Sequence, residues 1–322
     1  GMADIIAITS YWQFWVHSTG WSIVLAIGTL LLLLGLNLLT GFTGQISLGH
    51  AAFIGVGGYA AAILVTKVGL PFWLAMPLAG LVAAATGMVI GIPSLRVKGL
   101  YLVIATLAAQ FILEWVFVHW ESMTHGIRGI NVPAPSLAGF RFDTEEKFYY
   151  ITLLMVVLSV GFARNLVRTK WGRAFVAIRD RDLAAEIMGI NLFRYKLVAF
   201  GLSSFYAGIA GALWVGFIKV VTPEHFPFSL SIQYLAMVIV GGLGSVLGSI
   251  FGAVFMTLVP ELLNVLTSFA KASVPGLEHV FLPMKDVIFG LLIVSFLIFE
   301  PHGLAEIWHR IKNFFNLWPF SY

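Results

Sequence analysis

ARNLVRTKWGRAFVAIRDRDLAAEIMGINLFRYK, residues 163–196, is the most strongly charged stretch of the chain and lies between two long apolar runs. It holds eight basic and three acidic residues, a net charge of +5, whereas the whole chain carries only +4. Apart from this stretch, the chain is therefore slightly acidic. We name residues 162–197 the basic loop.

The basic loop also carries signals for local structure. Asp182 can accept backbone N–H groups at the start of a short helix over residues 183–188, where its charge suits the positive helix end. Gly189 can end that helix in a left-handed conformation, and Asn191 offers a cap for the next apolar run. A short helix within a basic loop indicates a surface for a partner rather than a plain connector.

The composition excludes a soluble globular domain. Of the 322 residues, 59% are hydrophobic and only 11% charged, with a mean hydropathy of +0.94, whereas soluble domains carry about 25% charged residues. The chain has no cysteine, which excludes disulfides, thiolate metal sites and a cysteine nucleophile. We predict an all-α, polytopic integral membrane bundle, in which the basic excess reflects orientation rather than binding to nucleic acid.

Hydropathy predicts nine spans, since a membrane helix needs about 20 apolar residues. The apolar block 230–265 is broken by glycines, so we divide it into two passes near Ser245. Residues 1–20 are predicted to be an interfacial segment, 21–305 a single transmembrane domain and 306–322 a C-terminal tail. The remaining spans lie near residues 21–39, 46–66, 72–92, 99–118, 148–163, 196–219 and 286–300.

The distribution of charge gives the orientation. With the basic loop on one side, alternation of the nine spans places twelve basic and five acidic residues there, against seven basic and ten acidic residues on the other side. The positive side faces the cytoplasm. The N-terminus is therefore expected outside, the C-terminus and the basic loop inside, and the connector 119–147 outside.

Residues 38–59, LLTGFTGQISLGHAAFIGVGGY, form the most specific motif in the chain. Glycines break the helical pattern at the membrane boundary, where irregular backbone is tolerated if protein or water covers it. Polar residues at apparent membrane depth are candidates for a translocation path, with ordinary hydrogen bonding between helices as the alternative. The candidates are Gln45, Ser47, His50, Gln110 and Gln233.

Small residues at a spacing of four predict close helix contacts, because helices in lipid associate through backbone approach. The clearest row is Gly244, Gly248 and Gly252. This row can serve the packing of the chain's own bundle or a contact with another subunit.

The motif at 38–59 resembles the corresponding stretch in permease subunits of branched-chain amino acid ABC importers, in particular the M-type subunit of the heterodimer. Three further stretches carry the same resemblance: GLYLVIATLAAQFILEW (99–115), RAFVAIRDRDLAAEIMGIN (173–191) and GGLGSVLGSIFGA (241–253). The resemblance extends over most of residues 20–305.

The resemblance implies that the basic loop couples the bundle to an ATPase. The residues expected to take part are Arg179, Asp180, Asp182, Ala184, Ala185, Glu186 and Gly189. The small alanines would let a partner surface approach closely. The implied partners are a second permease subunit, two ATP-binding subunits on the cytoplasmic side and a periplasmic binding protein, in a bacterial inner membrane, with branched-chain or related small amino acids as cargo.

Other functions fit the sequence less well. The chain has no G-x-x-x-x-G-K-[ST] motif for nucleotide phosphates, so ATP hydrolysis is expected on separate subunits, and no cofactor or metal is expected. An ion-coupled secondary transporter would need paired ionisable groups at mid-membrane, and a membrane enzyme would need a nucleophile beside a base. An ABC permease for urea, short amides or aromatic acids stays open as an alternative.

Overall fold

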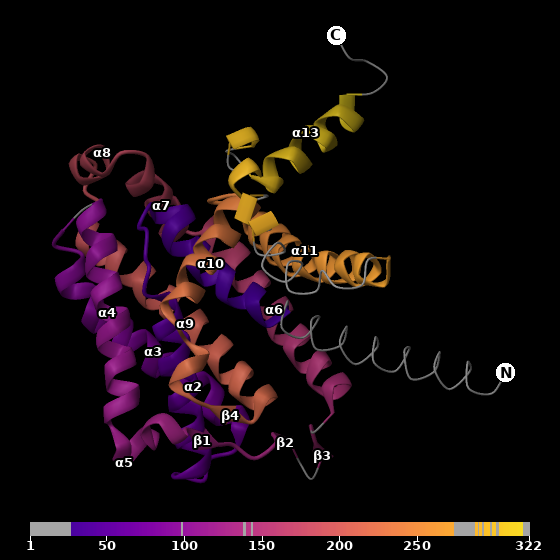
Figure 1. Ribbon diagram of the computed structural model, residues 1–322. Helices are drawn as coiled ribbons and strands as arrows, with labels where there is room; N and C mark the ends of the chain where they lie inside the picture. The colour runs from indigo at the N-terminus through magenta and orange to yellow at the C-terminus, as the bar shows by residue number, and fades with distance from the viewer. Residues whose placement is uncertain are drawn as a thin grey trace.

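Helices make up almost all of the structure (Figure 1), a computed structural model that describes residues 27–273, 287–300 and 303–317 except 98, 138, 139, 143, 289, 292 and 297. This follows from the apolar composition, because a helix satisfies its own backbone groups in lipid. Residues 27–37 are helical and continue into a π-helical turn, η1 (Leu38–Phe42). The other helices and 3-10 turns are α2 (His50–Thr66), α3 (Phe72–Ser94), α4 (Leu100–His119), α5 (Glu121–Thr124), η2 (Gly126–Arg128), α6 (Glu145–Arg168), α7 (Lys170–Asp180), α8 (Asp182–Ile187), α9 (Leu192–Ile218), η3 (Pro223–His225), α10 (Phe228–Gly241), α11 (Val246–Ser273) and α13 (Leu304–Leu317).

The centre of the bundle is α9, which packs against α2 and α3. Glycines allow this contact to reach backbone distance: a Cβ atom built on Gly57 of α2 would lie 2.3 Å from Gly208 Cα of α9. One turn further along α9, a Cβ atom on Gly211 would lie 2.0 Å from the Ile54 carbonyl oxygen. Close backbone approach therefore holds the three central helices together.

The outer helices carry a broad apolar surface. Large side chains such as Ile112 and Trp115 of α4, and Leu154 and Val157 of α6, are exposed. Four described helices, α3, α4, α6 and α9, are long and apolar enough to cross a membrane. The bent pair formed by α10 and the first half of α11 raises that number to five if it counts as one span. The chain is thus a multi-pass membrane protein, and the count of nine spans stays a prediction.

The two ends of the bundle differ (Figure 1). At one end, α7 and α8 project beyond the central helices; at the other lie α5 and a small two-stranded sheet. In that sheet β1 (Ile130–Asn131) pairs antiparallel with β4 (Val220–Val221). A hairpin of β2 (Ser136–Leu137) and β3 (Phe140–Arg141) follows β1. The basic loop and the connector 119–147 therefore lie at opposite ends, as the alternation of charge predicts.

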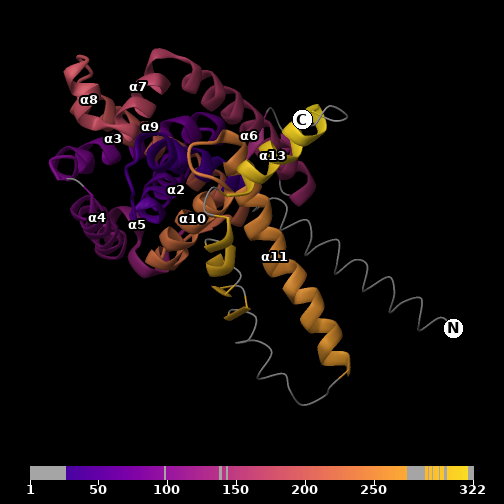
Figure 2. The same ribbon diagram turned by 90° about the horizontal axis from the view of Figure 1, so that it is seen from above.

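The predicted break near Ser245 is present, because α10 ends at Gly241 and α11 begins at Val246. The chain bends by 119° between the two helices. Figure 2 shows α11 extending away from the central helices. Gly248 and Gly252 lie where α11 crosses the backbone of α10, whereas Gly244 lies in the break itself with a φ of +76°.

Two sequence predictions concern boundaries. The span expected to begin at residue 46 begins as a helix only at His50, because the backbone from Gly44 to Gly49 is irregular. The predicted interfacial segment 1–20 lies outside the described residues, as do residues 318–322 of the predicted tail.

Candidate functional site: the platform and its junction

The basic loop folds into a platform made of α7 and α8. Thr169 begins α7, its hydroxyl accepting a hydrogen bond from the Trp171 backbone N–H at 3.2 Å. Phe175 and Ile178 are buried beneath the platform and fix α7 to the bundle. The predicted short helix is present as α8, Gly189 follows it with a φ of +85°, and the Asn191 side chain accepts from Arg194 N–H at 2.9 Å. The short helix and the roles of Gly189 and Asn191 are confirmed, but α8 spans Asp182–Ile187 rather than residues 183–188. Its N-cap position is Arg181, without a side-chain cap bond, so the predicted cap role of Asp182 is wrong.

The outer face of α8 is apolar. Leu183, Ile187 and Met188 are 67%, 87% and 84% exposed, although a water-facing helix normally buries such residues. Ala184, Glu186 and Gly189 are exposed beside them. We name Leu183, Ile187 and Met188 the apolar face of the platform.

Ala185 corrects one prediction. Its side chain is only 3% exposed, so α8 turns this methyl group toward its own chain and no partner can contact it directly. The helical period separates it from its exposed neighbours by about 100° per residue. The surface available to a partner is therefore made by larger apolar side chains, which the sequence analysis did not single out.

The acidic residues of the platform make local contacts. Asp182 accepts a hydrogen bond from Leu183 N–H at 2.9 Å, and its other carboxylate oxygen lies 4.0 Å from Lys196 Nζ. Asp180 lies 3.2 Å from Arg179 Nε. These contacts stabilise the turn between α7 and α8.

Arg179 reaches from the platform to the bundle, although 38% of its side chain stays exposed. Its Nη1 donates a hydrogen bond of 2.9 Å to the Gly41 carbonyl oxygen, in the π-helical turn η1. A Cβ atom on Gly244 would lie 2.5 Å from the same nitrogen, so the guanidinium also packs on the break between α10 and α11. Arg179 therefore joins the platform to two distant segments.

Asn37 completes this junction. Its side-chain nitrogen donates to the Ser245 carbonyl oxygen at 2.7 Å and to the Ser249 hydroxyl at 2.8 Å, and its oxygen accepts from Gly244 N–H at 2.8 Å. Asn37 is 1% exposed, and a buried amide with every group bonded fixes its surroundings strongly. We name Asn37, Gly41, Gly244 and Arg179 the glycine junction.

Three of the candidate path residues form a buried polar cluster at the start of α2. His50 bonds to the hydroxyls of Ser47, at 3.1 Å, and Ser203, at 2.6 Å. Gln110 of α4 accepts from Ala52 N–H at 2.8 Å and donates to the Phe226 carbonyl at 3.0 Å. Ser47, His50 and Gln110 are fully buried. In this structure Ser47, His50 and Gln110 make hydrogen bonds within the bundle, which was the alternative to a role in a translocation path.

The other two candidates lie apart from that cluster. Gln233 is exposed on α10. Gln45 is buried, donates to the Thr43 hydroxyl at 2.9 Å and lines a polar cleft of about 260 Å³ beneath the platform. The structure therefore does not bring the five predicted path residues together along one route.

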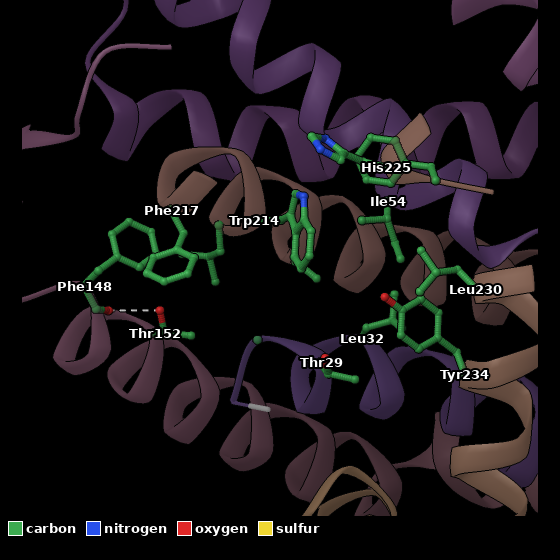
Figure 3. Close-up of a pocket in the computed structure, with 14 residues that line it drawn as sticks. Thr29, Leu32, Ile54, Phe148, Thr152, Trp214, Phe217, His225, Leu230 and Tyr234 are labelled. Carbon is green, nitrogen blue, oxygen red and sulfur yellow. Dashed lines mark hydrogen bonds between the residues drawn. The ribbon is translucent and has the colours of Figure 1, made fainter. Parts of the chain in front are cut away.

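An apolar cavity lies in the opposite half of the bundle (Figure 3), between residues 28–32, α6, α9 and α10. Aromatic side chains dominate its wall, and the Thr152 hydroxyl is already bonded to the Phe148 carbonyl oxygen. Its volume of about 50 Å³ suffices for a few waters, since a cavity that holds benzene measures about 150 Å³. The cavity is too small for an amino acid.

Comparison with known proteins gives the family. Residues 20–297 match the family described as branched-chain amino acid transport system / permease component. The chain belongs to that family. No solved structure matches the chain.

Two relatives are high-affinity branched-chain amino acid transport system permease proteins named LivM. The protein of Salmonella typhimurium is 34% identical, covering 94% of this chain and 74% of its own length, and that of Escherichia coli is 32% identical, covering 97% and 76%. A probable branched-chain amino acid transport permease protein LivH of Methanocaldococcus jannaschii is 27% identical, covering 88% of this chain and 90% of its own length. Permeases of this family are transport components and not enzymes. No cluster of three potential metal ligands occurs among the residues that the structure describes.

Proposed function

We propose that the chain is one of two permease subunits in an ATP-driven importer of branched-chain amino acids. Its relatives carry the two names LivM and LivH, which favours a pair of unlike permease subunits. Two ATP-binding subunits on the cytoplasmic side and a substrate-binding protein on the opposite side complete the proposed assembly. The proposed location is the bacterial inner membrane.

The observation that carries this proposal is the apolar face of the platform. Ile187 and Met188 are among the most exposed apolar side chains, and they lie outside the bundle on a loop with a net charge of +5. A cluster of exposed apolar residues rimmed by charges marks a protein interface. We assign this face to the ATP-binding subunit.

A second permease subunit is part of the proposal because the described residues form no continuous polar route for the cargo. Ser47, His50 and Gln110 are held by hydrogen bonds within the bundle, and the apolar cavity is too small for an amino acid. A path between two subunits resolves both observations. Selection among aliphatic amino acids then falls mainly to the binding protein.

For the membrane arrangement we propose nine passes, with the N-terminus outside and the platform and C-terminus inside. The opposite placement of the platform and the connector 119–147 supports this arrangement, as does the excess of basic residues on the platform side. In this scheme α10 and α11 are two separate passes joined at the glycine junction.

The docking test is Ile187→Asp in the assembled complex. A carboxylate buried against an apolar partner surface loses its hydration without a counter-ion, so the amount of ATP-binding subunit that copurifies should fall about tenfold or more, which corresponds to about 1.4 kcal/mol. The matched control Ile187→Leu keeps the surface apolar and should bind normally.

Two readings separate the proposal from its rival, a helix that rests on anionic lipid. Copurification and amino acid uptake should fall together in Ile187→Asp. If both are unchanged while binding of the purified chain to vesicles of anionic lipid falls, the apolar face is a lipid-surface element and the proposed docking is wrong.

A further inference from the structure

We infer that Arg179 is a positioning residue that transmits movement of the platform to the broken helix pair α10–α11. The inference rests on the proposed function, because it assumes that an ATP-binding subunit moves the platform. Arg179 acts through the glycine junction and touches neither nucleotide nor cargo.

Three segments of the chain meet at the side chain of Arg179. Arg179 lies near the end of α7, its aliphatic part packs on Gly44, and its Nη1 bonds to the Gly41 carbonyl oxygen. The same nitrogen occupies the space where Gly244 would otherwise carry a side chain. The platform, the end of the first helix and the break in α10–α11 therefore converge on one guanidinium.

The π-helical turn η1 and the break between α10 and α11 are in direct contact independently of Arg179. A Cβ atom on Gly41 would lie 2.2 Å from Gly244 N, so the two backbones are in direct contact. Asn37 adds bonds to Ser245 and Ser249 across a separation of more than 200 residues. A displacement of Gly41 must therefore displace the start of α11.

Both η1 and the α10–α11 pair depart from regular α-helix at the points where they meet. A π-helical turn inside an α-helix often marks a functional site, and η1 is such a turn. The α10–α11 pair bends by 119° at a break of four residues. A hinge needs only a few residues at the end of an element to absorb a large change of backbone angle, and this break provides them.

The hydrogen bond from Arg179 to the Gly41 carbonyl oxygen contributes more than the ion pair between Arg179 and Asp180. The Asp180 carboxylate is 61% exposed, and an exposed ion pair contributes little. The Gly41 bond is charge-assisted and part-buried. Arg179 is therefore anchored to the bundle through Gly41, while 38% of its side chain remains exposed.

The experiment uses the full complex in proteoliposomes and the variant Arg179→Met, which keeps much of the side chain's length and removes the bond. ATP hydrolysis stimulated by loaded binding protein, and amino acid uptake, should each fall about tenfold, while the ATP-binding subunit copurifies normally. The control Arg173→Met removes the same charge from the same helix, and among the described residues the Arg173 guanidinium donates to the Arg168 carbonyl oxygen within the basic loop, away from the glycine junction. This control should keep both activities. Full activity in Arg179→Met would overturn the inference.

A second measurement does not depend on the folding of that variant. The chain has no cysteine, so spin labels can be placed at Lys170→Cys on α7, Leu243→Cys in the break, and Val68→Cys at the opposite end of the bundle. On ATP binding, the 170–243 distance should stay constant while the 170–68 distance changes. If the 170–243 distance changes as much as the 170–68 distance, or neither changes, the inference is wrong.

The proposed function fails separately. A parent complex without stimulated hydrolysis and uptake would contradict the importer itself. A parent complex that couples normally, together with an Arg179→Met complex that couples normally, contradicts only the role of Arg179.

Discussion

At the scale of single residues, glycine is the side chain that this bundle uses to bring backbones into contact. At Gly57, Gly208 and Gly211 the neighbouring helix lies closer than any Cβ atom allows. The same holds at Gly41 in the junction. Because lipid tails are as apolar as the side chains, such contacts replace the hydrophobic effect as the source of helix association.

We therefore expect Gly57→Ala to destabilise the chain by about 1–3 kcal/mol, as over-packing of a tight interior does. Gly161→Ala on α6 is the matched control, because nothing lies within 4 Å of its Cβ position. Alanine there should be neutral or stabilising by up to about 1 kcal/mol. The thermal midpoint of the purified chain in detergent measures both, and equal midpoints would show that α2 and α9 can separate at no cost.

Residues that act locally could be predicted from the sequence, and residues that act at a distance could not. Gly189 and Asn191 end and begin helices through their own backbone geometry, so their roles were visible in the sequence. The contact of Arg179 with the bundle depends on Gly41 and Gly244, which are far away in the chain. The family resemblance placed Arg179 among the residues expected to contact a partner, and that role stays a prediction.

At the scale of elements, α8 separates two alanines that the sequence treats alike. Ala184 is exposed, whereas Ala185 is buried against the chain. A one-residue step on a helix turns a side chain by about 100°. Which of the two faces a partner depends on how α8 lies on α7 and α9, and no local signal contains that information.

Tryptophan at the two positions should therefore have different effects. Ala185→Trp should disturb the fold of the platform, and trypsin should cut residues 162–197 about tenfold faster, a factor that corresponds to about 1.4 kcal/mol. Ala184→Trp should leave the digestion rate unchanged and reduce copurification of the ATP-binding subunit. Equal digestion rates for the two variants would show that Ala185 is not part of the platform's packing.

Element boundaries followed the same rule. The glycines at 241–244 predicted the break between α10 and α11, because they interrupt an otherwise apolar run. Hydropathy placed the start of the second span near residue 46, but the helix begins at His50. Apolarity reports depth in the membrane, and backbone regularity depends on partners elsewhere in the fold.

At the scale of the whole molecule, topology is the prediction with the widest consequences. We expect Thr169→Cys, at the start of the platform, to be protected from an impermeant thiol reagent in intact cells whose outer membrane has been permeabilised. Ser136→Cys in β2 should react. Both positions are exposed in the structure, so burial does not explain a difference. Reaction at Thr169→Cys alone would reverse the orientation and remove the platform from the ATP-binding subunits.

The sequence predicted the helical membrane bundle and the short helix of the platform, whereas its candidates for the translocation path stay a prediction. Ser47, His50 and Gln110 are polar in an apolar chain, which is why they were candidates. Their hydrogen bonds join residues that are far apart in the sequence, so they could be seen only in the folded structure. If the path lies between two permease subunits, as proposed, residues of the other subunit also form its wall and this sequence does not contain them.

The start of α2 has a consequence for how the chain is made. The backbone N–H of Ala52 depends on Gln110, and that of Ala51 on Ser231, a residue synthesised 180 positions later. These two N–H groups therefore gain their final partners only after α4 and α10 have been made, and until then the start of α2 depends on water or on temporary partners. Assembly of this bundle therefore finishes in a different order from that in which its helices are translated.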